Sequence, residues 1–153
     1  MHGQAISPDP THAEERTRRP RVTFVIPTLN SADTLPECLG SIRAQDFDRR
    51  DLEIVIADAG STDATLDIAR RHDVDVIADN PLKTGEAGKS AALAKARGEI
   101  LVMLDSDNVL DSPQWLANML KPFDDPGIFA AEPLHYTRRS PDPALTRYFA
   151  LLG

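Results

Sequence analysis

Short apolar runs alternate along this chain with longer stretches in which apolar residues recur at helical spacing. The apolar runs predict five β-strands, at residues 22–26, 52–57, 74–78, 99–104 and 127–132. The amphipathic stretches predict helices at residues 31–45, 61–72, 89–98, 112–123 and 142–152. Because strand and helix alternate and the strands are apolar throughout, the pattern predicts right-handed βαβ units. The expected fold is α/β, a Rossmann-like open and mostly parallel sheet with helices on both faces.

Individual residues refine two of these helices. The first helix has an apolar face at Leu35, Leu39 and Ile42. Cys38 lies on the same apolar side and is interpreted as a small core residue. In the fourth helix, Ser112 is the predicted N-cap and Pro113 occupies the first helical position.

The domain organisation follows from length and from the N-terminal composition. Residues 1–20 are polar, contain three prolines and show no periodicity, so we expect a flexible arm. Residues 21–153 are expected to form one domain, since a chain of 153 residues has the usual size for one core.

Charge and cysteine content narrow the classes of partner and compartment. The chain has 17 basic and 24 acidic residues, a net charge of -7, which argues against nucleic acid or an anionic membrane as a partner. It has one cysteine, no secretory signal and no apolar run of about 18 residues. A cytoplasmic protein is expected, in which membrane association would have to come from segments outside this chain.

Polar residues follow three of the predicted strands directly. In open parallel sheets ligands bind beyond the carboxyl ends of the strands, near the point where the strand order reverses. The residues in question are Pro27, Thr28 and Asn30 after the first strand, Asp58 to Asp63 after the second, and Asp105 to Asn108 after the fourth.

Asp105 and Asp107 are the candidate metal ligands. If strand geometry persists, two side chains two residues apart point the same way and can share one hard cation. Carboxylate oxygens suit Mg²⁺ or Mn²⁺, and Mg²⁺ usually completes its shell with waters and substrate phosphates. The alternative is that these residues form a turn that ends the strand.

Residues 58–63 and the separate stretch 85–90 also have two interpretations each. Gly60 permits a tight turn, and Asp58 is placed to accept hydrogen bonds from a base or a ribose. Gly85 to Ser90 lacks the spacing of a phosphate-binding P-loop, because Lys83 stands where the first glycine is needed. Gly88, Lys89 and the helix N-terminus are nevertheless placed to meet a phosphate, unless Lys89 is simply an exposed lysine.

Three segments together resemble the nucleotide-sugar-binding half of glycosyltransferase family 2, whose members are inverting enzymes with a GT-A fold. The segments are VTFVIPTLN, IVIADAGSTD and GKSAALAKARGEILVMLDSDN. The resemblance extends over about residues 21–133 and keeps the order and separation of the motifs. It implies transfer of a sugar from a nucleoside-diphosphate donor to an acceptor.

The resemblance also implies a role for each matching residue. The residues implied to bind the donor are Pro27, Thr28, Asn30, Asp58, Lys89 and Asp105. Among them Asp58 would reach the base, and Lys89, where many members carry arginine, would approach the ribose or the diphosphate. Asp107, together with Asp105, would hold Mg²⁺ or Mn²⁺ at the diphosphate.

Two departures from the family pattern matter. Many members have a second acid where this chain has Ala59, so recognition of the base is in doubt. The catalytic base of the family lies well downstream of the Asp-x-Asp segment, so it is expected beyond Gly153, and we do not assign that role to Glu132. The chain is therefore expected to carry the donor-binding half, without the C-terminal part of the domain.

The acceptor and the assembly stay open at this level. The resemblance favours a UDP-sugar as donor and a saccharide or a lipid carrier as acceptor, while the oligomeric state is undefined. The alternative function is a nucleotide-sugar-binding module without turnover. A nucleotidyltransferase is disfavoured, because residues 27–30 replace the glycine-rich loop expected after its first strand.

Overall fold

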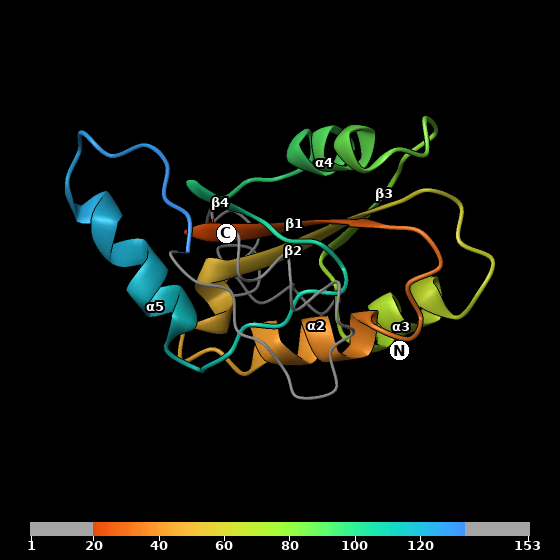
Figure 1. The fold of residues 1–153 in the computed structure, drawn as a ribbon, viewed down its shortest axis with the longest axis horizontal. Helices are drawn as coiled ribbons and strands as arrows, with labels where there is room; N and C mark the ends of the chain where they lie inside the picture. Colours follow the sequence, from red (N-terminus) through yellow and green to blue (C-terminus); the bar gives the residue numbers. More distant parts are fainter. Residues whose placement is uncertain (1–19, 134–153) are drawn as a thin grey trace, which may run out of the picture.

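A computed structural model describes residues 20–133, which form a parallel sheet with helices on both faces (Figure 1). The strands are β1 (Val22–Thr28), β2 (Leu52–Asp58), β3 (Val76–Asp79) and β4 (Ile100–Met103). Their order in the sheet is β3-β2-β1-β4 and every pairing is parallel. The predicted α/β class and the first four predicted strands are confirmed.

The strand order reverses at β1. The chain moves outward from β1 to β2 and β3, and then returns to pair β4 with the other side of β1. The register aligns Thr28 with Asp58 at the ends of β1 and β2, and Val25 with Met103 on β4. The loops that follow β1 and β4 therefore flank the position at which open α/β sheets bind their ligands.

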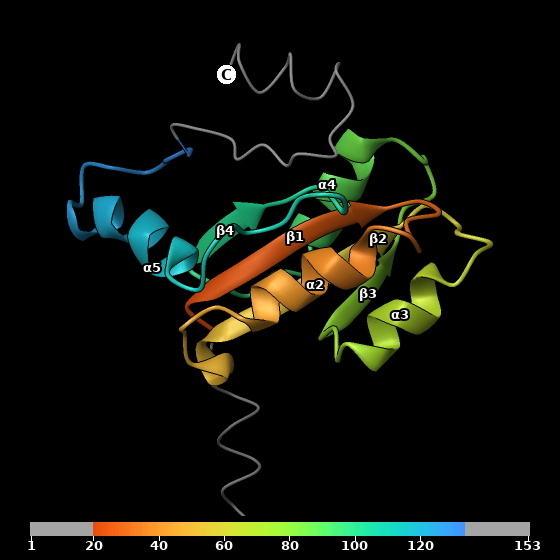
Figure 2. The same cartoon turned by 60° about the horizontal axis from the view of Figure 1, so that its bottom comes forward.

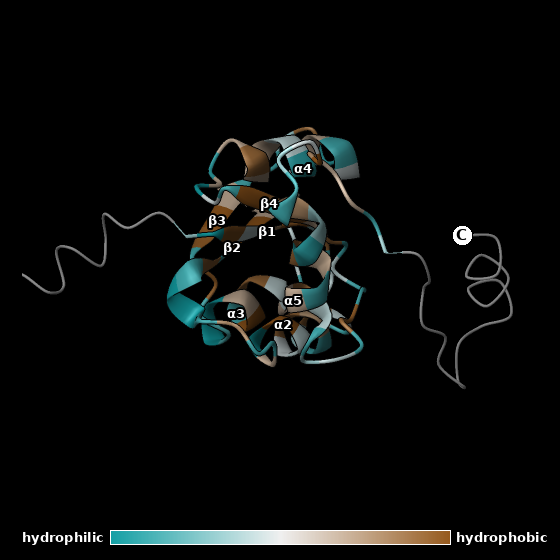
Figure 3. Ribbon diagram, turned by 90° about the vertical axis from the view of Figure 1, so that its left-hand side faces the viewer, coloured by the Kyte–Doolittle hydropathy of each residue, from teal (hydrophilic) through white to brown (hydrophobic). Residues whose placement is uncertain are grey.

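The helices form two layers around the sheet (Figures 2 and 3). One layer contains α2 (Leu35–Arg43), α3 (Thr65–Arg71) and α5 (Trp115–Leu120), and the other contains α4 (Gly85–Leu93). Two short 3₁₀ helices, η1 (Arg49–Asp51) and η2 (Lys121–Asp124), lie after α2 and α5 in the chain. Within the described residues no helix is long and apolar enough to cross a bilayer.

The core lies on both faces of β1 and β2. The larger cluster packs the sheet against α2, α3 and α5, and includes Phe24, Ile26, Leu35, Leu39, Ile42, Ile54, Ile56 and Leu116. The predicted apolar face of α2 and the burial of Cys38 are thus confirmed. On the other face α4 packs closely, since a Cβ at Gly88 would lie 2.8 Å from the Cβ of Pro27.

The fifth predicted strand is not formed, and α2, α3, α4 and α5 begin three or four residues from their predicted starts. Residues 127–132 form no strand; Asp125 instead closes a turn, accepting from the backbone N–H groups of Gly127 and Ile128. The helix α4 begins at Gly85 instead of residue 89, because Thr84 caps it by accepting from the N–H of Ala87.

The start of α5 was also placed too early. The helix begins at Trp115, and Gln114 is its N-cap. The backbone carbonyls of Ser112 and Pro113 instead accept hydrogen bonds from Gln45 and Asp46, which follow α2. The predicted arm at residues 1–20, apart from Pro20, and the predicted helix at 142–152 lie outside the described residues.

Candidate functional site

Asp58 organises the loop between β2 and α3. Its Oδ1 accepts from Thr28 Oγ1 (3.0 Å) and Ser61 Oγ (2.6 Å), and its Oδ2 accepts from the N–H groups of Gly60 (2.9 Å) and Ser61 (2.8 Å). Burial opposes ionisation, but these hydrogen bonds outweigh it and hold the pKa of Asp58 below its ordinary value. Since a carboxylate has about four acceptor positions, a base could contact Asp58 only by exchanging one of these bonds.

The loop after β1 is tied to the loop after β2. Asn30 has a φ of 49°, in the left-handed region that asparagine tolerates better than most residues. Its Oδ1 accepts from the N–H of Thr62 (2.8 Å), and its own N–H donates to Ser61 Oγ (2.8 Å). The N–H of Ala32 donates to Asp63 Oδ2 (3.0 Å). Asn30 thus holds the two loops in a fixed relation, and its predicted contact with a nucleotide stays a prediction.

The structure adds Asn80, which the sequence reasoning did not select. Asn80 follows β3 directly and is buried, and its Nδ2 donates to Thr84 O (2.9 Å). Its Oδ1 is buried and has no hydrogen-bond partner among the described residues. An unpaired buried acceptor is unfavourable, so this atom stands out at the carboxyl edge of the sheet. The available signal was position, because Asn80 follows its strand much as Asp105 follows β4.

Lys89 and Asp105 form an ion pair between α4 and the segment after β4. Lys89 Nζ lies 3.1 Å from Asp105 Oδ1, and both side chains are partly exposed. Lys89 is the fifth residue of α4, so it is not at the helix N-terminus. The expectation that Gly88 offers a free N–H to phosphate is also wrong, since this group donates to Thr84 O (3.0 Å). Only the positive charge of Lys89 remains from that prediction, and it lies beside Asp105, one of the two candidate metal ligands.

Residues 105–108 form a β-turn, which we call the acid turn. The N–H of Asn108 donates to Asp105 O (3.0 Å), so strand geometry ends before the two acids and these residues form a turn, while their role as metal ligands stays a prediction. Ser106 Oγ lies 2.9 Å from Ser31 Oγ and joins the acid turn to the loop after β1.

Burial, together with the negative charges of Asp107 and Asp105, raises the pKa of the Cys38 thiol to about 12. Both carboxylates therefore lie close enough to act on one buried group.

The donor set of the acid turn fits a cation that is shared with a substrate. Among residues 20–133 no three His, Cys, Asp or Glu side chains converge as metal ligands. Asp105 and Asp107 offer two hard carboxylates, and both are exposed. Mg²⁺ and Mn²⁺ sites of this kind take their other ligands from water and from substrate phosphates. The arrangement suits a metal–diphosphate complex rather than a metal held by protein alone.

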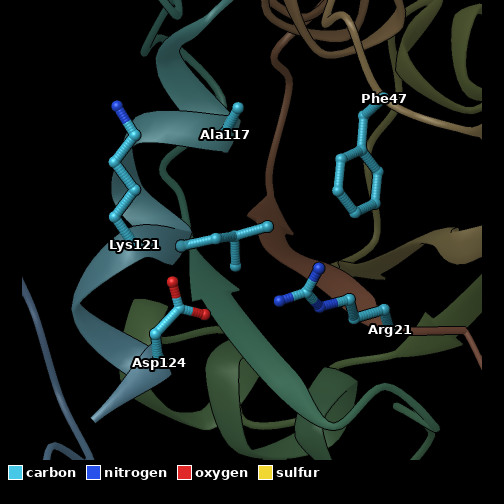
Figure 4. A pocket seen from close by; sticks show the side chains of 6 residues that line it. Arg21, Phe47, Ala117, Lys121 and Asp124 are labelled. Atoms are coloured by element: carbon cyan, nitrogen blue, oxygen red, sulfur yellow. The ribbon is translucent and has the colours of Figure 1, made fainter.

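A cavity of about 200 Å³ lies at the opposite end of the sheet (Figure 4). Its lining residues are Arg21, Phe47, Ala117, Leu120, Lys121 and Asp124. Arg21 precedes β1, whereas the loops described above follow the strands. This cavity is therefore separate from the candidate site.

Comparison with known proteins points to one family. The sequence pattern of "Glycosyl transferase family 2" matches residues 23–143. A poly(ribitol-phosphate) β-glucosyltransferase of Bacillus spizizenii is 33% identical over 98 residues, which are 60% of this chain and 16% of that protein. A glycosyltransferase of PGL/p-HBAD biosynthesis from Mycobacterium bovis is 54% identical over 50 residues, which are 33% of this chain and 19% of that protein.

Solved structures give the same answer for the fold. The mannosyltransferase PcManGT of Pyrobaculum calidifontis, solved with GDP-Man and Mn²⁺, superimposes with a TM-score of 0.64 at 36% identity, over 82% of this chain and 36% of that one. Residues 1–349 of S. aureus TarS, solved with UDP-GlcNAc, give 0.57 at 27% identity, over 67% of this chain and 31% of that one. The chain thus spans about a third of these neighbours and has part of their GT-A fold. It belongs to glycosyltransferase family 2.

Proposed function

We propose that this chain carries the donor-binding half of an inverting glycosyltransferase that uses a nucleoside-diphosphate sugar and a divalent cation. The observation that carries the proposal is the pairing of Lys89 with Asp105 beside Asp107, at the point where the strand order reverses. The ammonium group of Lys89 and two carboxylates therefore lie together where open α/β sheets bind nucleotides.

The part of the candidate site toward the nucleotide is assigned to the ends of β1, β2 and β3. Pro27 and Thr28 end β1, and Asn30 and Asp58 fix the loops beside them. The Oδ1 of Asn80 lies at the same edge without a partner among the described residues, but it is buried, so a base would reach it only if the packing around Asn80 opened. These residues would bind and orient the nucleoside.

The side toward the diphosphate is assigned to α4 and the acid turn. Asp107 and Asp105 would hold Mg²⁺ or Mn²⁺, which supplies the positive charge that a departing nucleoside diphosphate requires. Lys89 would exchange its partner Asp105 for a phosphate oxygen and add a second positive charge. An acceptor hydroxyl on a saccharide or a lipid carrier would attack the anomeric carbon from the opposite face, with a base contributed from beyond Gly153.

The identity of the base is proposed from the neighbours. TarS has been solved with UDP and with UDP-GlcNAc, and PcManGT with GDP-Man and Mn²⁺. These ligands support a nucleotide-sugar donor for this chain, with UDP-sugar as the first choice and GDP-sugar as the second.

Calorimetric titration of the 153-residue chain with UDP and GDP, each with and without Mn²⁺, tests the proposal. We expect one nucleotide to bind and Mn²⁺ to strengthen its binding. Asp107→Asn should remove the gain from Mn²⁺ while circular dichroism shows an unchanged fold, because the amide lacks the charge that a hard cation requires. Absence of nucleotide binding in the wild type, or an unchanged gain in the variant, would contradict the proposal.

The alternative, a binding module without turnover, is separated from an enzyme by a second measurement. Both would bind the nucleotide, but only a transferase would consume the nucleotide sugar when acceptors are offered. Because the chain spans about a third of its structural neighbours, this assay is informative for a protein that contains the downstream residues as well.

A further inference from the structure

The segment between β4 and α5 contains no helix or strand, and the acid turn lies near its start. It runs past α2 before it reaches α5 (Figure 1). Its apolar side chains Leu104 and Leu110 are buried in the core. Such a segment needs partners for its backbone groups, since buried N–H and C=O groups are almost always hydrogen-bonded.

One face of α2 and the residues just after it provide these partners. We call the hydrogen-bonding groups of Cys38, Ser41 and Gln45 the polar face of α2. Cys38 and Ser41 lie three residues apart on one side of the helix, beside its apolar face, and Gln45 follows the helix. The thiol of Cys38 donates to Asp105 O (3.8 Å). Ser41 Oγ donates to Cys38 O (2.7 Å) and accepts from the N–H of Leu110 (3.1 Å).

Gln45 fixes the far end of the segment with both ends of its amide. Its Nε2 donates to Ser112 O (2.8 Å) and to Ser41 O (3.1 Å), and its Oε1 accepts from the N–H of Leu116 (2.8 Å). Gln45 is 7% exposed, so these bonds are shielded from water. The segment from Asp105 to Leu116 is therefore attached to α2 at its start, middle and end.

The polar face also lies close to the charges of the acid turn. Cys38 Sγ lies 3.8 Å from the backbone oxygen of Asp105, the first residue of the acid turn, and Cys38 lies one helical turn from Ser41. A change in how the segment sits on α2 would therefore move the two carboxylates relative to Lys89.

We propose that the polar face of α2 holds the acid turn where Asp105 and Asp107 act together on one cation, with Ser41 as the central positioning residue. Ser41 contacts neither nucleotide nor cation in this scheme and acts through the backbone of Leu110. The inference rests on the proposed function, because the cation site is the feature that is positioned.

The test compares wild type with Ser41→Ala and Ser41→Thr in the 153-residue chain. Ser41→Ala removes the acceptor of the Leu110 N–H, whereas Ser41→Thr keeps a hydroxyl at the same position. We expect Ser41→Ala to reduce the Mn²⁺-dependent gain in nucleoside-diphosphate affinity about threefold to tenfold, the effect of one ordinary hydrogen bond. Affinity for the nucleoside without metal should stay unchanged, and Ser41→Thr should restore the gain.

A second readout needs no metal. The N–H of Asn108 closes the acid turn, so its hydrogen exchange should accelerate in Ser41→Ala and return toward the wild-type rate in Ser41→Thr. An unchanged exchange rate, or an equal loss of nucleoside and metal-dependent binding in Ser41→Ala, would overturn the positioning role. If the wild type itself gains nothing from Mn²⁺, the proposed function fails and this inference fails with it, whereas a failure confined to the variants leaves the proposed function standing.

Discussion

The ion pair between Lys89 and Asp105 sets the local charge of the candidate site in the absence of a ligand. The pair is 3.1 Å long and partly exposed, so it is held weakly enough to be exchanged for a stronger partner. A diphosphate is such a partner, because it offers more charge and more acceptor oxygens than one carboxylate.

Lys89→Ala should therefore weaken binding of the nucleoside diphosphate about tenfold or more and leave binding of the free nucleoside almost unchanged. The physical reason is that only the diphosphate gains from the ammonium group. Lys95→Ala is the matched control, since Lys95 is an exposed lysine that follows the same helix. Parallel titrations with UDP and uridine measure both affinities; equal losses for the two ligands would remove this role from Lys89.

At the residue level the sequence identified the candidate site residues better than it predicted what each of them contacts. The acids and Lys89 could be selected because their positions after strands are visible in the sequence. The four hydrogen bonds that Asp58 accepts could not be predicted, because they depend on how the loop folds back on the carboxylate. Asn80 and Ser41 were missed for the same reason, since their partners are backbone groups brought near by the fold.

The helix α4 shows how close packing positions a functional side chain. A Cβ added at Gly88 would lie 2.8 Å from the Cβ of Pro27 and 2.9 Å from Asn80 Nδ2, which is too close for either contact. Gly88 thus lets α4 approach the sheet, and the next residue, Lys89, reaches Asp105 from there.

Gly88→Ala should lower the free energy of unfolding by about 1–3 kcal/mol, the usual effect of overpacking, and should weaken diphosphate binding by displacing Lys89. Gly40→Ala is the control, because Gly40 is an exposed helical glycine whose added Cβ would meet nothing within 4 Å. The control should gain up to about 1 kcal/mol from helix propensity. Urea unfolding measures both; equal stability changes in the two variants would contradict the packing argument.

The elements themselves were predictable to different degrees. Strands β1 and β2 are long, apolar and buried on both faces, so their existence followed from the sequence. The start of α4 was misplaced because glycines at 85 and 88 have poor helix propensity, while the Thr84 cap and the packing against Pro27 favour the helix. Residues 127–132 are apolar enough for a strand but follow a turn set by Asp125.

Across the whole molecule, buried carboxylates join segments that are distant in the sequence. Glu53 on β2 is 1% exposed and accepts from Thr23 Oγ1 (2.7 Å) on β1 and from Arg97 N (2.8 Å) and Nε (2.7 Å) before β4. Burial opposes its ionisation, but these bonds outweigh it and hold the pKa of Glu53 below its ordinary value. The pKa of Asp58 is lowered for the same reason.

These lowered pKa values predict how stability depends on pH. A carboxyl group whose pKa is lowered by folding contributes fully above its ordinary pKa, and the contribution is lost as pH falls through the folded value. The free energy of unfolding should therefore be level near neutral pH and fall below about pH 4.5. Glu53→Gln should be less stable at pH 7, by about 2 kcal/mol, and should show a shallower acid slope.

Thermal unfolding from pH 7 to pH 2 measures this dependence. Asp33→Asn, at an exposed acid, is the control and should keep the wild-type slope. An acid slope in Glu53→Gln as steep as in the wild type would show that Glu53 does not contribute to it.

Cys38 has a chemical consequence beyond its hydrogen bond. It is the one cysteine in the sequence, it is fully buried, and its pKa is raised to about 12, so its thiol is almost entirely protonated at pH 8. Because alkylating reagents attack the thiolate, Cys38 should be inert while α2 and the acid turn stay together. The rate at which Cys38 is alkylated therefore reports how often these two segments separate. A second cysteine introduced at the surface can be labelled selectively while Cys38 is kept.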